Sequence, residues 1–298
     1  MLKQLTESIK AQVSTHVLNQ EAITELALAA FFAGGHIVLV GPTGMGKTAW
    51  ARAFAGSLGL SYGTARPNTT HSAQPSQLFS QLFHVKQDSE YQDHIDIVLQ
   101  EPSPAQVWFN NLIIDTIDKN TNHIPGTGGE PFPMPVPNMI VVSGTDTRHL
   151  PKALIDRFMM KLYVNYPGVA AEKQMLQLHH TGVCTTPIPI CTQETITQAK
   201  QEVQNVAVED PIFNYIISIT ETTRRISAIK TGASPRASIS LLMASKAYAA
   251  ICGRDYVTID DVQSLAIPVL RHRVTLRADA INEGLHADRI IEGIIVGK

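Results

Sequence analysis

The chain has 298 residues, which is enough for one large domain or two ordinary ones. Hydrophobic residues make up 44% and charged residues 17%, so the composition supports a packed core and excludes a disordered chain. The formal net charge of −2 provides no overall field that would attract nucleic acid or an anionic membrane, and three cysteines are too few for a disulfide framework.

The start of the chain shows no targeting signal. Its first 18 residues are polar and amphipathic, without the apolar run of a signal peptide. The apolar stretch at 23–32 is too short to span a bilayer and ends in two glycines. We therefore expect a soluble protein of the cytoplasm with no membrane segment.

The first half alternates helical patterns with short β-branched apolar runs. Helices are predicted at 21–33 and 46–58, buried strands at 36–40, 112–114, 139–142 and 161–164, and loop or edge structure in the Pro- and Gly-rich segment 124–138. Strands separated by helical or long connections are typical of an α/β domain with a mostly parallel sheet.

From residue 168 onward the pattern is almost entirely helical. Ser234 followed by Pro235 is a favourable helix start, with serine as the N-cap and proline at the first helical position. Thr258 with Asp261 three residues later resembles a capping box. We therefore divide the chain into an α/β core at 1–167 and a smaller all-helical domain at 168–298.

One glycine-rich segment carries the strongest chemical signal. It reads Gly41-Pro42-Thr43-Gly44-Met45-Gly46-Lys47-Thr48 and matches the P-loop pattern G-x-x-x-x-G-K-[ST]. The glycines let backbone N–H groups surround phosphate oxygens, and the helix that follows directs its positive end at the same anion. Lys47 would reach the β- and γ-phosphates, and the Thr48 hydroxyl would bind Mg²⁺. The segment predicts binding of ATP with Mg²⁺.

A P-loop site also needs an acidic residue at a strand end to hold the metal. Asp115, after the predicted strand at 112–114, fits this role, although an aspartate there can also be an ordinary turn residue. The next residue in such ATPases is usually a glutamate that activates water, and here it is Thr116. Threonine cannot act as a base at neutral pH, so we expect slow hydrolysis.

Several further motifs carry a family resemblance. They are 154–158 (LIDRF), 232–237 (GASPRA), 253–258 (GRDYVT) and 270–273 (LRHR). With the P-loop, they make the chain resemble the MoxR family of AAA+ ATPases over nearly its full length. The resemblance implies a P-loop AAA+ core with a parallel sheet in an αβα sandwich, followed by a smaller helical lid.

The resemblance also implies roles for three residues outside the P-loop. Asp146 aligns with a polar sensor of the γ-phosphate that is usually asparagine, and an acid there would repel phosphate. Arg157 resembles an arginine finger that reaches a neighbouring subunit's nucleotide, and an ordinary surface ion pair is the alternative. Arg236 resembles the lid arginine that contacts the nucleotide of its own chain, and a solvated arginine is the alternative.

The implied function is a chaperone-like, ATP-driven remodeller of a protein partner, often one with a von Willebrand factor A domain. It would work as a homo-hexamer or a hetero-ring. An ATP-binding switch or structural subunit with little or no hydrolysis is the alternative, favoured by Thr116, Asp146 and the short segment at 117–127. A nucleic-acid motor is disfavoured by the net charge, despite the basic pairs at 224–225 and 271–273.

Overall fold

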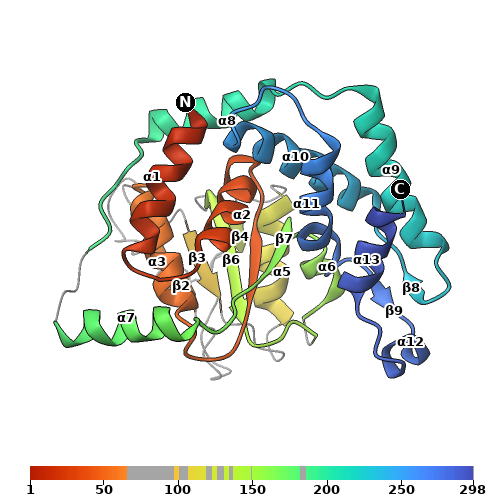
Figure 1. The fold of residues 1–298 in the computed structure, drawn as a ribbon, viewed down its shortest axis with the longest axis horizontal. Coiled ribbons are helices and arrows are strands. Elements are labelled where there is room, and N and C mark those ends of the chain that lie inside the picture. Colours follow the sequence, from red (N-terminus) through yellow and green to blue (C-terminus); the bar gives the residue numbers. More distant parts are fainter. Residues whose placement is uncertain are drawn as a thin grey trace.

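The computed structural model describes residues 1–65, 97–100, 107–118, 123–125, 131–133, 137–148, 150–181 and 186–297. Its centre is a sheet of five strands, and Figure 1 shows this sheet between helices on both sides. The strands are β1 (Ile37–Val40), β2 (Tyr62–Ala65), β3 (Ile97–Gln100), β6 (Met139–Gly144) and β7 (Met160–Tyr163). Their order is β2-β3-β6-β1-β7 and every pairing is parallel, which confirms the predicted fold class.

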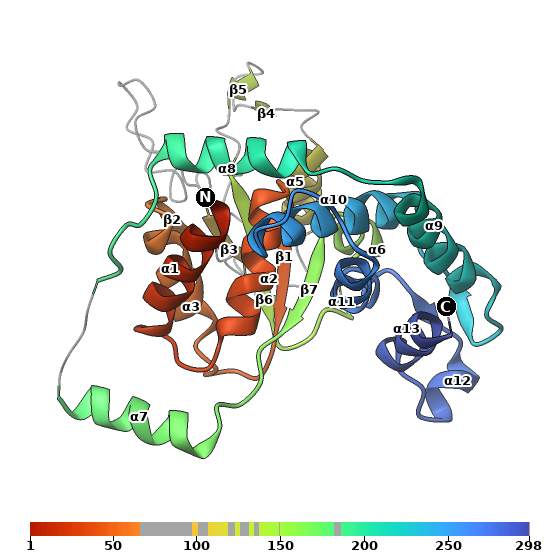
Figure 2. The same cartoon turned by 45° about the horizontal axis from the view of Figure 1, so that its top comes forward.

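Two groups of helices cover the sheet. The first group is α1 (Leu2–Ser14), α2 (Glu21–Phe32) and α3 (Lys47–Ser57), which contact one another around α1. The second group, α5 (Val107–Asp118) and α6 (Lys152–Ile155), lies on the other side in both views (Figures 1 and 2). Because both faces of β1 and β6 are covered, β1 is apolar throughout and β6 is apolar over its first four residues, rather than alternating.

The described residues after β7 form helices and one short antiparallel strand pair. The helices are α7 (Val169–His180), α8 (Gln193–Asn205), α9 (Asp210–Arg225), α10 (Pro235–Ile251), α11 (Ile259–Leu270), α12 (Ala278–Asn282) and α13 (Ala287–Val296). The pair is β8 (Ile229–Thr231) with β9 (Thr275–Leu276), which the helical pattern did not indicate. Ser234 is the N-cap of α10 and Thr258 forms the predicted capping box with Asp261.

The sheet domain and the helical part share one hydrophobic core. Phe31 and Phe54 belong to the same buried cluster as Leu241 of α10 and Leu265 of α11. Helix α10 packs on α2, and α11 packs on β7. The division near residue 167 therefore remains a prediction from sequence. None of the helices in the described ranges has the length and apolar character needed to cross a bilayer.

The strand predicted at 112–114 is wrong. These residues lie inside α5, and the strand of this part of the sheet is β3, at 97–100. A three-residue apolar run fits a helix as well as a strand, and its neighbours continue a helical pattern. The Pro-rich segment predicted as loop or edge structure contains two short paired strands, β4 (His123–Pro125) and β5 (Pro131–Pro133).

Candidate functional site

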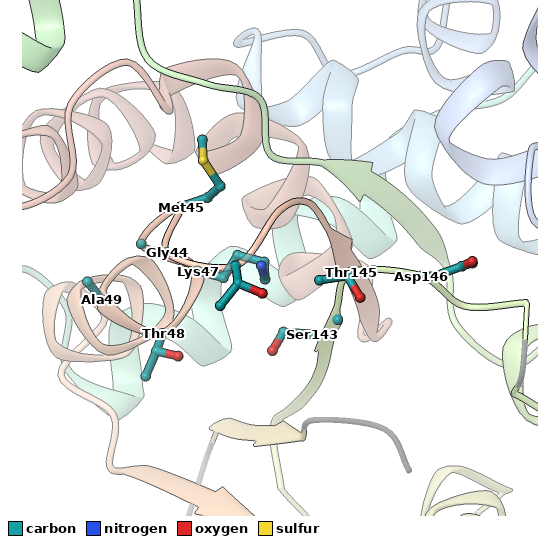
Figure 3. A pocket seen from close by; sticks show the side chains of 11 residues that line it. Gly44, Met45, Lys47, Thr48, Ala49, Ser143, Thr145 and Asp146 are labelled. Carbon is teal, nitrogen blue, oxygen red and sulfur yellow. The ribbon is translucent and has the colours of Figure 1, made fainter. Parts of the chain in front are cut away.

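The glycine-rich segment forms a loop between the end of β1 and the start of α3. Gly44 and Gly46 adopt φ values of +85° and +76°, which L residues with a side chain rarely adopt. The loop borders a cavity of about 560 Å³ that is closed on its other side by residues 143–146 at the end of β6 (Figure 3). The backbone around this cavity therefore has the form that the motif predicts.

Gly41 anchors the loop to two neighbouring strands. Its N–H donates a hydrogen bond of 3.1 Å to the carbonyl oxygen of Gly144 in β6. On its other side a Cβ atom would overlap the carbonyl oxygen of Val164, just after β7. The loop is thus fixed to the sheet at its first residue, and only glycine fits there.

Lys47 and Thr48 occupy the first turn of α3 at the mouth of the cavity. Lys47 Nζ donates hydrogen bonds of 2.8 and 2.7 Å to the carbonyl oxygens of Gly41 and Pro42. The ammonium group therefore lies over the loop, where an anion would meet both the positive charge and the helix N-terminus (Figure 3). Thr48 is partly exposed and lines the same cavity.

Asp146 borders the cavity but turns its charge away from the loop. Figure 3 shows its carboxylate directed away from Lys47, with Thr145 between them. Burial raises the pKa of Asp146, but hydrogen bonds from Arg148 outweigh this effect and hold the pKa below its usual value. Since Arg148 neutralises the acid, the repulsion of phosphate expected from the sequence is weakened.

Neither Asp115 nor Thr116 is among the described residues that line the P-loop cavity. The prediction that Asp115 binds the metal assumed that residues 112–114 form a strand, and this assumption is wrong. Asp115 and Thr116 both belong to α5: Asp115 is exposed, and buried Thr116 borders a second cavity of about 310 Å³. The missing base inferred from Thr116 therefore has no structural support.

The strand β3 lies beside β6, which separates it from β1 and the P-loop. Its last residue, Gln100, pairs with Val142 of β6, directly before the part of β6 that closes the cavity. An apolar run, Ile97-Val98-Leu99, ends here in Gln100, and that signal was available in the sequence. The next residue is Glu101, which lies outside the described residues. The strand β3 thus ends in a glutamine, whereas the sequence analysis expected an aspartate after a strand in this part of the chain.

Arg157 lies near the amino-terminal ends of the parallel strands, whereas the P-loop lies at their carboxyl-terminal ends. Arg157 precedes β7 by three residues, and Met160 of β7 is in register with Ile37 at the start of β1, whereas the P-loop follows the end of β1. Since each strand residue advances about 3.3 Å, the length of β1 alone separates the two ends by about 10 Å. Arg157 is therefore separated from the P-loop of its own chain by the length of β1.

Arg157 is held by a carboxylate that the sequence did not single out. Its Nε donates to both oxygens of Asp118 at 3.0 and 2.9 Å, and its Nη2 also pairs with Asp118. Arg236, in the first turn of α10, lies 3.7 Å from Asp118 and 3.9 Å from Asp156. The structure therefore places Arg236 beside Asp118 and Arg157, and Arg236 is not among the described residues that line the P-loop cavity.

The basic residues at 271–273 belong to the packing of the lid. Arg273 is fully buried, and its Nη2 donates a 2.7 Å hydrogen bond to the carbonyl oxygen of Phe158. Burial lowers the pKa of Arg273 to about 10. Arg271 pairs with Asp288 at 2.8 Å and lies over the ring of Tyr163. These side chains are thus occupied within the chain, which removes support for a nucleic-acid surface there.

Comparison with known proteins agrees with this geometry. Residues 37–166 match the family described as ATPases associated with various cellular activities, and residues 221–294 match the AAA lid domain. The uncharacterized protein YeaC of Bacillus subtilis is 31% identical over 94% of this chain and 89% of its own length. Chaperone MoxR1 of Mycobacterium tuberculosis is 26% identical over 95% of this chain and 79% of its own length.

The fold also matches a solved structure. A crystal structure of a protein from Cytophaga hutchinsonii, described as a candidate ATPase, superposes with a TM-score of 0.82 over 99% of this chain and 94% of that one. Its sequence identity of 24% makes this a likeness of fold alone. Two further relatives, called protein MoxR, come from Paracoccus denitrificans and Methylorubrum extorquens and are 24% and 25% identical.

Proposed function

Because the chain belongs to the MoxR family of AAA+ ATPases, we propose that it binds ATP with Mg²⁺ in the P-loop cavity and hydrolyses it only within a ring. The loop fits a triphosphate chain, since Gly44 and Gly46 free its amides and Lys47 lies beside it. Thr48 supplies a hydroxyl for the metal. When bound, Mg²⁺ would neutralise charge on the phosphates.

The observation that carries the ring is the separation of Arg157 from the P-loop of its own chain. A guanidinium group stabilises phosphoryl transfer only when it contacts the transferred phosphate. Arg157 and Arg236 lie together near the amino-terminal ends of the strands, and the P-loop lies at the carboxyl-terminal ends. Both arginines would therefore act on a second copy, in a homo-hexamer or hetero-ring.

Helix α7 gives this proposal a surface for the second copy. It follows Val164, which contacts Gly41, by only a few residues, and both views show it standing apart from the body (Figures 1 and 2). Val169 and Leu176 of this helix are 86% and 69% exposed. A neighbour that brings its arginines to the P-loop would also cover these apolar side chains.

The work that we propose for the ring is remodelling of a protein partner. A relative called Chaperone MoxR1 supports this role. The family resemblance implies that the partner carries a von Willebrand factor A domain. A second function, an ATP-binding switch with little hydrolysis, is favoured by Gln100. A neutral amide holds Mg²⁺ more weakly than a carboxylate does, which would slow the chemical step more than nucleotide binding.

Two measurements on the pure protein separate these functions. Calorimetry should show uptake of ADP and of a non-hydrolysable ATP analogue with Mg²⁺, and Lys47→Ala should abolish it. Phosphate release per chain should rise with protein concentration as rings assemble, which indicates the remodeller. Nucleotide uptake with no phosphate release at any concentration indicates the switch, and no uptake at all contradicts both functions.

A further inference from the structure

Asp118 joins two arginines that come from different parts of the chain. The carboxylate accepts from Arg157, which precedes β7, and lies 3.7 Å from Nη2 of Arg236 in the lid. Asp118 itself is at the end of α5, so three separate elements meet at one side chain. A single carboxylate thus links the position of Arg157 in the core to the position of the lid.

The pair is rigid on the core side. The side chains of Arg157 and Asp118 are only 17% and 23% exposed, and Nη1 of Arg157 donates a 2.6 Å hydrogen bond to the carbonyl oxygen of Ala153. The hydrogen bond from Arg157 holds the pKa of Asp118 below its usual value, although burial opposes this. Asp118 is therefore ionised at neutral pH, and Arg157 has one defined position.

The lid side is held more loosely and through a second acid. Arg236 is 43% exposed, and its contacts with Asp118 and Asp156 are both longer than 3.5 Å. Asp156 in turn accepts from Ser234 at 3.3 Å and lies 3.9 Å from buried Arg273. Arg236 thus stays beside the fixed arginine but keeps the freedom to turn toward a ligand.

From this arrangement we infer that Asp118 is the positioning residue for the arginine pair that acts on the neighbouring subunit's nucleotide. It fixes Arg157 directly and keeps Arg236, and with it the start of α10, in register with Arg157. Asp118 does not contact the nucleotide, and its effect passes through the two guanidinium groups. The inference rests on the proposed function, because it needs a ring in which both arginines work in trans.

Steady-state kinetics on the full chain test the role. Asp118→Asn should lower kcat by about tenfold to a hundredfold, the cost of misplacing a group that must meet the transition state. The affinity of the P-loop for ADP should stay unchanged, because a chain binds its nucleotide at the carboxyl-terminal ends of its strands. Asp118→Glu, which keeps the charge, should restore much of kcat, and Asp115→Asn, an exposed acid on the same helix, should match the wild type.

Asp118→Asn combined with Arg157→Ala separates positioning from a merely structural role. If Asp118 acts through Arg157, the double variant should show nearly the same kcat as Arg157→Ala alone. Losses that multiply would overturn the inference, and so would a fall in ADP affinity in Asp118→Asn. A wild-type kcat in a folded Asp118→Asn ring would overturn it as well.

Mixed rings distinguish this inference from the proposed function. A Lys47→Ala chain keeps its arginines and an Arg157→Ala chain keeps its P-loop, so mixing the two should restore phosphate release at their shared interfaces. Asp118→Asn mixed with Lys47→Ala should restore it in the same way. If only the first mixture recovers, the role of Asp118 fails and the ring stands. If neither mixture recovers, or the wild type releases no phosphate, the proposed function fails and the role of Asp118 falls with it.

Discussion

The backbones of Gly41 and Val164 touch, so that the first residue of the P-loop has no room for a side chain. Gly41→Ala places a methyl group on the carbonyl oxygen after β7, and overpacking of this kind costs about 1–3 kcal/mol. We expect a lower thermal unfolding temperature. We also expect the affinity for ADP to fall, by about tenfold for each 1.4 kcal/mol of this cost that distorts the P-loop. Calorimetry and thermal unfolding measure the two effects.

Gly168→Ala is the matched control for this change. Residue 168 has open space around it and a backbone conformation open to other residues, so the extra methyl group meets nothing within 4 Å. This variant should bind ADP and unfold as the wild type does. Equal behaviour of the two variants would show that the contact between Gly41 and Val164 does not constrain the loop.

Gln100, the last residue of β3, provides a test of which residue would hold the metal. Gln100→Asp gives Mg²⁺ an anionic oxygen in place of a neutral one, a difference on the order of 1.4 kcal/mol or tenfold in affinity. We expect the Mg²⁺ concentration for half-maximal phosphate release to fall accordingly. Titration of Mg²⁺ at saturating ATP measures it.

Asp115→Asn is the contrasting variant, because the sequence pattern assigned the metal to Asp115. In the structure this side chain is exposed on α5. Its loss should leave the Mg²⁺ titration unchanged. If Asp115→Asn changed the Mg²⁺ concentration for half-maximal phosphate release and Gln100→Asp did not, Asp115 would again be the candidate metal ligand.

The P-loop and its helix were predictable because their signal is local. The motif fixes its backbone through Gly44 and Gly46, and the strand before it is a continuous apolar run rich in β-branched residues. The capping box of Thr258 and Asp261 is local for the same reason. Each of these features depends on residues within a few positions of one another.

The strand end and the arginine pair were not predictable in this way. Both 97–99 and 112–114 are short apolar runs, and only the pairing of β3 between β2 and β6 shows which one is a strand. Asp118, Arg157 and Arg236 are far apart in the sequence and meet only through the fold. Sequence reasoning named both arginines as site residues, but no local pattern reports that they meet at Asp118.

Arg254 and Asp261 connect the lid's helices by a buried ion pair. Two hydrogen bonds of 2.6 and 2.5 Å join the guanidinium group to the carboxylate, which is 2% exposed and also caps α11. Asp261→Asn removes the charge partner of Arg254 and should lower the free energy of unfolding by about 3 kcal/mol. Urea unfolding at pH 7 measures this difference.

The pH dependence of that difference follows from the sign of the shift. Burial alone would raise the pKa of Asp261, but hydrogen bonds from Arg254 and Thr258 bring it below 3.8, its usual value. A depressed pKa in the folded state gives stability that is present above pH 3.8 and is lost as the pH falls through the folded-state pKa. The gap between wild type and Asp261→Asn should therefore narrow below pH 3.8, and a gap that widens there would contradict the assignment.

Leu176 tests whether the projecting helix α7 meets a second copy. Leu176→Glu places a charge on an apolar side chain that is 69% exposed, so the free chain should lose no core contact and unfold as before. If a neighbour buries this side chain, the protein concentration at which rings form should rise about tenfold or more, since desolvating a lone carboxylate costs over 1.4 kcal/mol. Mass photometry with ATP and Mg²⁺ measures assembly, and Gln177→Glu adds the same charge one residue later on the same helix as a control for charge alone. Equal assembly of Leu176→Glu and wild type would place α7 outside the ring interface, whereas impaired assembly of both charged variants would indicate repulsion between subunits rather than a lost apolar contact.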